Sequence, residues 1–119
     1  YYMYGTRAAD FGKKTGGFDV YVSDNLVDWS KPKACFNSDA FGLNREVNWA
    51  PEVHKYKDAY YMLATFTRDN GLRGTFSLRA DSPLGPFKPH RRIGNVLTAR
   101  FMLIKTETLI LFSAMSIHR

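Results

Sequence analysis

Several features that would define a class of protein are missing from this sequence. It has a single cysteine, Cys35, which excludes a disulfide within the chain. It has no run of about 18 apolar residues, so we expect no transmembrane helix and no membrane partner. Its three histidines lack the spacing of metal ligands, and no glycine-rich loop precedes a helix signal. We therefore expect neither a metal site nor a phosphate-binding loop.

Acidic side chains are scarce at one end of the chain. The net charge of the chain is +6. Residues 1–90 carry 12 basic and 10 acidic side chains, whereas residues 91–119 carry 5 basic side chains and 1 acidic side chain. A nucleic-acid-binding domain usually concentrates its basic residues on one face. Residues 1–90 instead intersperse both signs, so we expect no nucleic-acid partner.

What the chain does have is a series of short strand signals. Residues 18–22 alternate apolar and polar side chains, which is the period of a half-buried strand. Residues 53–56 and 59–66 flank Lys57-Asp58, an arrangement typical of a hairpin. No segment before residue 90 reads as a helix. The pattern predicts an all-β chain.

The strand pattern also repeats. Tyr1-Tyr2-Met3-Tyr4-Gly5-Thr6 recurs as Tyr60-Tyr61-Met62-Leu63-Ala64-Thr65, 59 residues later. A unit of short strands with that period is typical of a propeller blade. We assign what remains of blade one to residues 1–48 and blade two to residues 49–90. Two blades cannot close a ring, so we expect a fragment of a longer parent protein, whose signal peptide, if it has one, would lie upstream.

The segment Asn48-Trp49-Ala50-Pro51-Glu52 is the strongest candidate for function. An indole can stack on a sugar ring, Pro51 fixes the backbone, and Glu52 can accept a hydrogen bond or carry a proton. Arg7, which follows the first strand, could reach the same cleft. The alternatives are a core indole for Trp49 and a solvated loop arginine for Arg7.

Four segments together resemble glycoside hydrolase family 43, the five-bladed β-propellers that include arabinofuranosidases and xylosidases. They are Trp49-Ala50-Pro51-Glu52-Val53 before a Tyr-Tyr strand, residues 1–6, residues 20–29, and Asp81-Ser82-Pro83-Leu84-Gly85-Pro86-Phe87. The resemblance covers residues 1–90 and implies a partial five-bladed propeller of about two blades. Residues 1–6 resemble the inner strand of the first blade.

The same resemblance implies the function of the parent, namely hydrolysis of arabinofuranosyl or xylosyl linkages of plant polysaccharides with inversion. The three catalytic carboxyl groups of the family would lie before Tyr1, in the third blade and beyond residue 119. We therefore expect no catalytic residue here and an inactive fragment, with Trp49, Glu52 and Arg7 as substrate-binding candidates. The expected partner is a carbohydrate, and no cofactor is expected, although some relatives hold calcium on the axis of the intact propeller.

Two other functions remain open at this point. A non-catalytic carbohydrate-binding propeller would use the same tryptophan and glutamate, and a small stand-alone β-domain would need no further blades. The sequence assigns no compartment; a parent that degrades polysaccharide in the bacterial manner would be secreted or periplasmic.

Residues 91–119 form an atypical tail. They show none of the blade turns, and one choice of codons from Gly94 onward, read in another frame, gives a sequence that resembles the opening of a third blade. We predict a frame-shifted or non-native tail. A genuine C-terminal hairpin or helix is the alternative.

Overall fold

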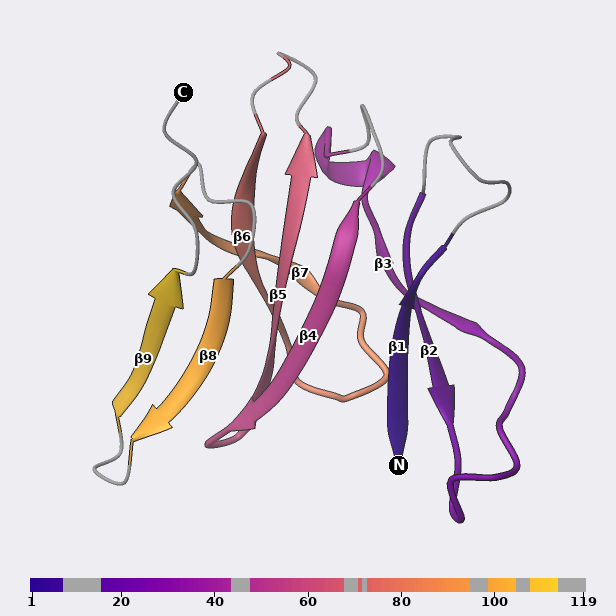
Figure 1. The fold of residues 1–119 in the computed structure, drawn as a ribbon. Helices are drawn as coiled ribbons and strands as arrows, with labels where there is room; N and C mark the ends of the chain where they lie inside the picture. Colours follow the sequence, from indigo (N-terminus) through magenta and orange to yellow (C-terminus); the bar gives the residue numbers. More distant parts are fainter. Residues whose placement is uncertain are drawn as a thin grey trace.

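The protein is all-β in a computed structural model that describes residues 1–7, 16–43, 48–67, 71 and 73–94, with the backbone alone of Trp49, residues 99–104 and residues 108–113. Its strands form three antiparallel sheets in the orders β1-β2-β3, β4-β5-β6-β7 and β8-β9 (Figure 1). The strands are β1 (Tyr2–Thr6), β2 (Gly17–Val22), β3 (Lys33–Asn37), β4 (Trp49–Tyr56), β5 (Ala59–Thr67), β6 (Arg73–Ala80), β7 (Lys88–Gly94), β8 (Ala99–Ile104) and β9 (Thr108–Ser113). The described part adds a short 3-10 helix, η1 (Asp39–Phe41), and contains no helix that could span a membrane.

The fold class expected from the sequence is confirmed: the first two sheets are about two blades of a propeller. The predicted alternation holds in β2, where Phe18 and Val20 are fully buried and Asp19 is not. The hairpin at Lys57-Asp58 also forms, with Lys57 at a positive φ of 52°.

Two outer strands were not foreseen from the sequence. Strands β3 and β7 lack a clean apolar alternation, and β7 is exposed along most of its length. Pro89 lies within β7, which is tolerated because β7 is the last strand of its sheet. Strand β3 forms by pairing with β2, and β7 forms by pairing with β6. Strand β7 continues past residue 90 to Gly94, which pairs with Thr75.

The expected position of the first strand needs correction. The repeated Tyr-Tyr-Met motif lies in β1 of the first sheet but in β5 of the second, where β4 is one strand further in. Residues 1–6 are therefore equivalent to the second strand of a blade, not to its inner strand. Among the described residues, the first sheet has no counterpart of β4, and β1 lies beside β4 itself.

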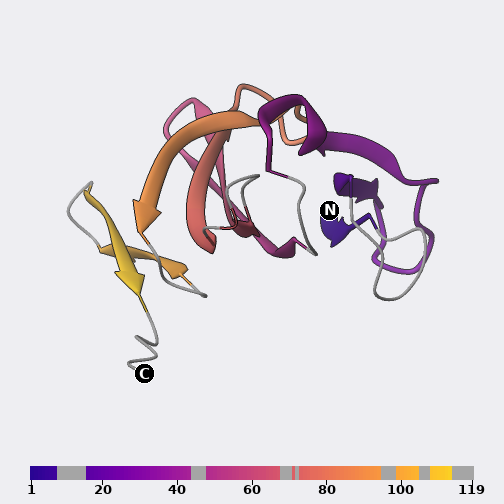
Figure 2. The same cartoon turned by 90° about the horizontal axis from the view of Figure 1, so that it is seen from above.

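The two blades share one apolar core. Phe66 of β5 has its ring centroid 5.6 Å from that of Phe18 and 5.4 Å from that of Phe36, which belong to the first blade. Phe76 of β6 lies 5.8 Å from Phe66. Seen along the strands, the two sheets stand side by side (Figure 2). The aromatic side chains of both sheets belong to one buried cluster, so each sheet packs part of its apolar surface against the other.

The loop between β6 and β7 joins the blades a second time. The loop contains a turn in which Gly85 donates its N–H to the carbonyl oxygen of Ser82 at 3.0 Å. The loop then reaches the first blade: Phe87 donates its N–H to the carbonyl oxygen of Cys35 at 2.8 Å, and the Tyr4 hydroxyl donates to that of Pro83 at 2.7 Å. Gly85 is required here, since it has φ of +77° and an added Cβ would lie 2.5 Å from the Cys35 oxygen.

The predicted tail, residues 91–119, contains the end of β7 and the pair β8-β9. The backbone of β8 and β9 pairs without interruption from Ala99 and Ser113 to Ile104 and Thr108. Backbone pairing does not depend on the reading frame from which the chain was translated. The frame-shifted origin of the tail therefore stays a prediction.

Candidate functional site

The start of β4 is held against the end of β1. The Thr6 hydroxyl donates to the carbonyl oxygen of Asn48 at 3.2 Å. Arg7 follows Thr6 and Trp49 follows Asn48, so this bond brings the backbone of two predicted site residues to the same end of the two strands. In Figure 1 this is the upper end of β4.

A β-bulge lies at the start of β4. Trp49 pairs with Thr65 and Glu52 with Leu63, so three steps along β4 oppose two along β5. Pro51 lies in the bulge, where its lack of an N–H costs no ladder hydrogen bond. Since Thr65 and Leu63 lie on one face of β5, the bulge sets positions 49 and 52 on one face of the sheet. The indole of Trp49 lies outside what the structure describes.

Glu52 faces away from the core between the blades. Val53 packs against that core, and Glu52 and His54 alternate with it on the other face. The Glu52 carboxylate lies 2.8 Å from Nε2 of His54, with 35% of the Glu52 side chain and 45% of the His54 side chain exposed. An ionised carboxylate has about four lone-pair sites. Glu52 therefore keeps the capacity to accept a hydrogen bond from a sugar hydroxyl.

Arg7 is held by the first blade. Its Nε and Nη2 both donate to Oδ1 of Asp19, at 2.9 and 2.8 Å, and its backbone N–H donates to the carbonyl oxygen of Gly17. About a third of the side chain remains exposed. Among the described residues, no hydrogen bond or ion pair joins Arg7 to Glu52. The structure thus places Arg7 at the same end of the blades as the start of β4 without uniting it with Glu52 in one network.

Two further residues support this end of the molecule: the sequence analysis did not identify Asp19, and it included Asn48 only as the first residue of the candidate segment. Asp19 orients Arg7, and Asn48 is fully buried and donates from Nδ2 to the Ser38 hydroxyl at 3.2 Å. The signal available for Asn48 was its position directly before Trp49. A buried amide at such a position needs hydrogen-bond partners, which only the folded arrangement reveals.

Two ionisable groups in the shared core are kept neutral. Burial, with a further contribution from the Asp19 carboxylate, raises the pKa of the Cys35 thiol to about 12. Burial and the nearby Cys35 likewise raise the pKa of the Tyr4 phenol well above its usual range. A nucleophilic cysteine needs its thiolate. Cys35, which donates to the carbonyl oxygen of Phe18, is a structural residue.

Three carboxylates of the described residues form ion pairs with basic side chains. Asp19 pairs with Arg7, Glu52 with His54 and Asp81 with Arg79. Within the described ranges there is also no cluster of three or more His, Cys, Asp or Glu residues that could hold a metal ion.

Comparison with known proteins finds a matching family and matching solved structures. The sequence model of glycosyl hydrolases family 43 matches residues 1–103. The crystal structure of a thermostable family-43 glycoside hydrolase superposes with a TM-score of 0.72 at 30% identity, over 93% of this chain and 36% of that chain. No curated protein matches significantly. The chain thus spans about a third of that solved relative. By a family match over most of its length and a fold shared with a solved member, the chain belongs to glycosyl hydrolases family 43.

Proposed function

We propose that this chain is part of a glycoside hydrolase that cleaves arabinofuranosyl or xylosyl linkages of plant polysaccharides with inversion. The observation that carries the proposal is the family match over residues 1–103, which includes the whole Trp49–Glu52 segment. Inverting glycosidases place a general acid and a general base roughly 6.5–9.5 Å apart, with a water between them. That reaction is proposed for the parent protein.

Within such a cleft, the described residues would bind substrate. Glu52 accepts a hydrogen bond from a sugar hydroxyl, while its contact with His54 fixes the orientation of the carboxylate. Trp49 supplies a stacking surface, and Arg7, oriented by Asp19, donates to a ring or hydroxyl oxygen. None of the three is proposed as a catalytic group.

The isolated 119 residues are proposed to be inactive. The chain spans 36% of the solved family-43 relative, and an inverting glycosidase needs two carboxyl groups on opposite sides of the scissile bond. We propose that the carboxyl groups needed for hydrolysis are supplied by other parts of the parent protein.

The test is hydrolysis of aryl α-L-arabinofuranoside and aryl β-D-xyloside by the 119-residue chain and by the longest reading frame that contains it. We expect activity only in the longer protein, with NMR showing an inverted anomer as first product. Glu52→Gln in that protein should raise KM about tenfold with a smaller change in kcat, whereas Asp58→Asn, in the exposed β4–β5 turn, should change neither. Retention of configuration, or no hydrolysis of either glycoside, would refute the proposal.

A non-catalytic carbohydrate-binding propeller is the second candidate. It is favoured by Glu52, whose carboxylate is paired with His54 and still 35% exposed, because such a group suits hydrogen bonding to sugars without bond cleavage. Binding of arabinoxylan oligosaccharides by the longer protein without any release of reducing ends would select this function. Soluble, cooperative unfolding of the 119 residues alone would instead support a stand-alone domain.

The origin of the tail is tested by the coding DNA. We propose that residues 91–119 are translated in a shifted frame, because one choice of codons from Gly94 onward, read in another frame, resembles the opening of a third blade. The alternative frame should then continue without stops through further blade motifs. Stop codons in that frame would make the β8-β9 hairpin a natural terminus.

A further inference from the structure

A pocket lies at the end of the second blade opposite the start of β4. It is formed where β6 ends and β7 begins, and its volume is about 390 Å³. The end of β6 pairs with the first residues of β5, next to the β4–β5 hairpin, whereas Trp49 pairs with Thr65 near the other end of β5. The pocket is therefore separate from the proposed hydrolytic cleft.

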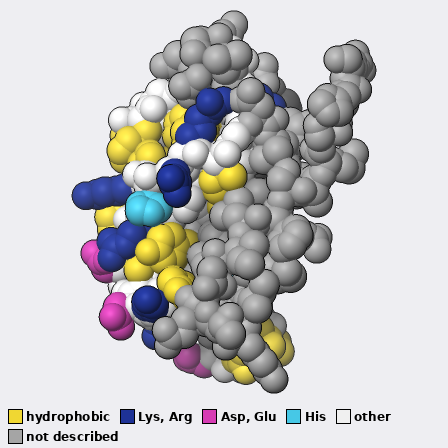
Figure 3. All heavy atoms as spheres, turned by 90° about the vertical axis from the view of Figure 1, so that its left-hand side faces the viewer, with side chains coloured by type: hydrophobic (Ala, Val, Ile, Leu, Met, Phe, Trp, Pro, Cys, Tyr) yellow, Lys and Arg dark blue, Asp and Glu magenta, His cyan; other side chains and the backbone are white. Residues whose placement is uncertain are grey.

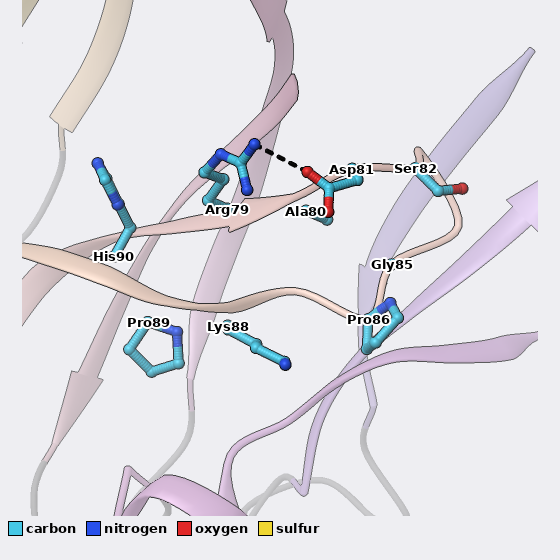
Figure 4. A pocket seen from close by; sticks show the side chains of 9 residues that line it. All are labelled: Arg79, Ala80, Asp81, Ser82, Gly85, Pro86, Lys88, Pro89 and His90. Carbon is cyan, nitrogen blue, oxygen red and sulfur yellow. Dashed lines mark ion pairs between the residues drawn. The ribbon is translucent and has the colours of Figure 1, made fainter. Parts of the chain in front are cut away.

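Basic side chains outnumber acidic ones around this pocket. Arg79, Lys88 and His90 line it, and Asp81 is the acidic residue among its lining (Figure 4). Arg79 donates to the Asp81 carboxylate at 2.8 Å, so these two charges offset one another. Lys88 is exposed and has no ion-pair partner in the part of the chain that the structure describes. The pocket thus retains a positive charge that faces solvent.

The same pocket offers surfaces for a ring. The His90 ring lies edge-on to that of Tyr61, with centroids 5.7 Å apart, and Pro86 and Pro89 contribute apolar rings without N–H groups. In Figure 4, His90 and Arg79 extend to one side of the strands, Pro89 lies in β7 and Pro86 lies in the loop before it. Figure 3 shows basic side chains beside a histidine and hydrophobic surface on this side of the molecule.

We propose that this pocket binds a hexuronate, a sugar ring that carries a carboxylate, as found in acidic polysaccharides. Lys88 and Arg79 would meet the carboxylate, and the exposed Asp81 would accept from ring hydroxyls. The prolines and His90 would cover the apolar face of the ring. A cationic and partly apolar pocket of this size holds one such ring better than a neutral sugar, because the charge pair adds to the contact with the ring. The choice of a sugar as ligand rests on the proposed glycosidase function; the anion preference rests on the charges alone.

The test is a titration of the 119-residue chain with D-glucuronate, D-glucose and inorganic phosphate, followed by NMR of the β6 and β7 amides. We expect glucuronate to bind with a Kd on the order of 1 mM, a standard free energy of about −4 kcal/mol. Lys88→Gln should weaken binding about fivefold or more and Lys88→Arg should restore it, while Lys33→Gln on exposed β3 should have no effect. Binding should also weaken as salt is raised, since the charges are exposed.

The competing ligands define the results that would overturn the proposal. Phosphate binding as tight as that of glucuronate would make this a general oxyanion site, and equal binding of glucose would remove the role of charge. If the chemical shifts of the β6 and β7 amides do not change, the basic residues would serve only to protect the edge strand β7 from pairing with another chain. Hydrolysis of neutral aryl glycosides by the longer protein does not use this pocket. If glucuronate does not bind but the longer protein hydrolyses aryl glycosides, only this inference is contradicted. If glucuronate binds but the longer protein hydrolyses neither glycoside, only the proposed function is contradicted.

Discussion

Phe66→Ala is expected to destabilise both blades together. Phe66 lies in β5 of the second blade and is fully buried, yet it packs against Phe18 and Phe36 of the first blade as well as Phe76 of its own. Removing the ring opens a cavity between the sheets rather than within one of them. The shared core predicts that neither blade keeps its stability when this contact is lost.

The magnitude follows from the burial of the ring. A fully buried phenylalanine cut to alanine costs about 3–5 kcal/mol, which is a large share of the roughly 5–15 kcal/mol that stabilises a typical domain. For a chain of this length, that corresponds to a fall in Tm of roughly 10–20 °C. Phe41→Ala is the matched control. Phe41 also stacks on Phe36 but is 44% exposed, so its loss should cost about 1 kcal/mol.

The assay is urea unfolding followed by circular dichroism, with amide hydrogen exchange resolved for β2 and β5. In the Phe66→Ala variant, protection should fall by a similar free energy in both strands. Loss of protection in β5 with β2 unchanged would show that the blades are stabilised independently and would refute the reasoning. Equal effects of Phe66→Ala and Phe41→Ala would contradict the burial argument.

Three further perturbations test particular contacts. Because the pKa of Cys35 is raised to about 12, the stabilising contribution of its protonated thiol is complete below pH 9 and is lost as the pH rises toward 12. Urea unfolding across this range should show a fall in the free energy of unfolding, and Cys35→Ala should reduce that fall. An unchanged pH profile would contradict the burial of the thiol. Gly85→Ala should lower the free energy of unfolding by more than about 1 kcal/mol because of its positive φ and the nearby carbonyl, whereas Gly94→Ala, with nothing within 4 Å, should lie within about 0.5 kcal/mol of the parent chain. Asn48→Ala should cost about 1–3 kcal/mol in thermal unfolding, and the double variant with Ser38→Ala should cost less than the sum of the two; simple additivity would argue against their hydrogen bond.

The strands with strong patterns could be predicted, and those without could not. The apolar alternation of β2 and the hairpin between β4 and β5 depend on neighbours along the chain, so residues 18–22 and 53–66 carry their own signal. Strand β7, with Pro89 and a run of exposed basic residues, becomes a strand because β6 offers it a ladder of hydrogen bonds. The conformation of an outer strand depends on the strand with which it pairs, and a local window of sequence does not contain that partner.

The candidate site divides in the same way. The sequence alone identified the family, and it predicted Trp49, Pro51 and Glu52 as a functional segment, because residue types and their order can be recognised without the fold. Only the tertiary structure decided that a bulge at Pro51 sets positions 49 and 52 on one face and that Glu52 pairs with His54. It also decided that Arg7 is held by Asp19 and that a basic pocket forms between β6 and β7. Residue types and their spacing are local properties, whereas register, burial and ion pairing arise when segments far apart in the chain pack together.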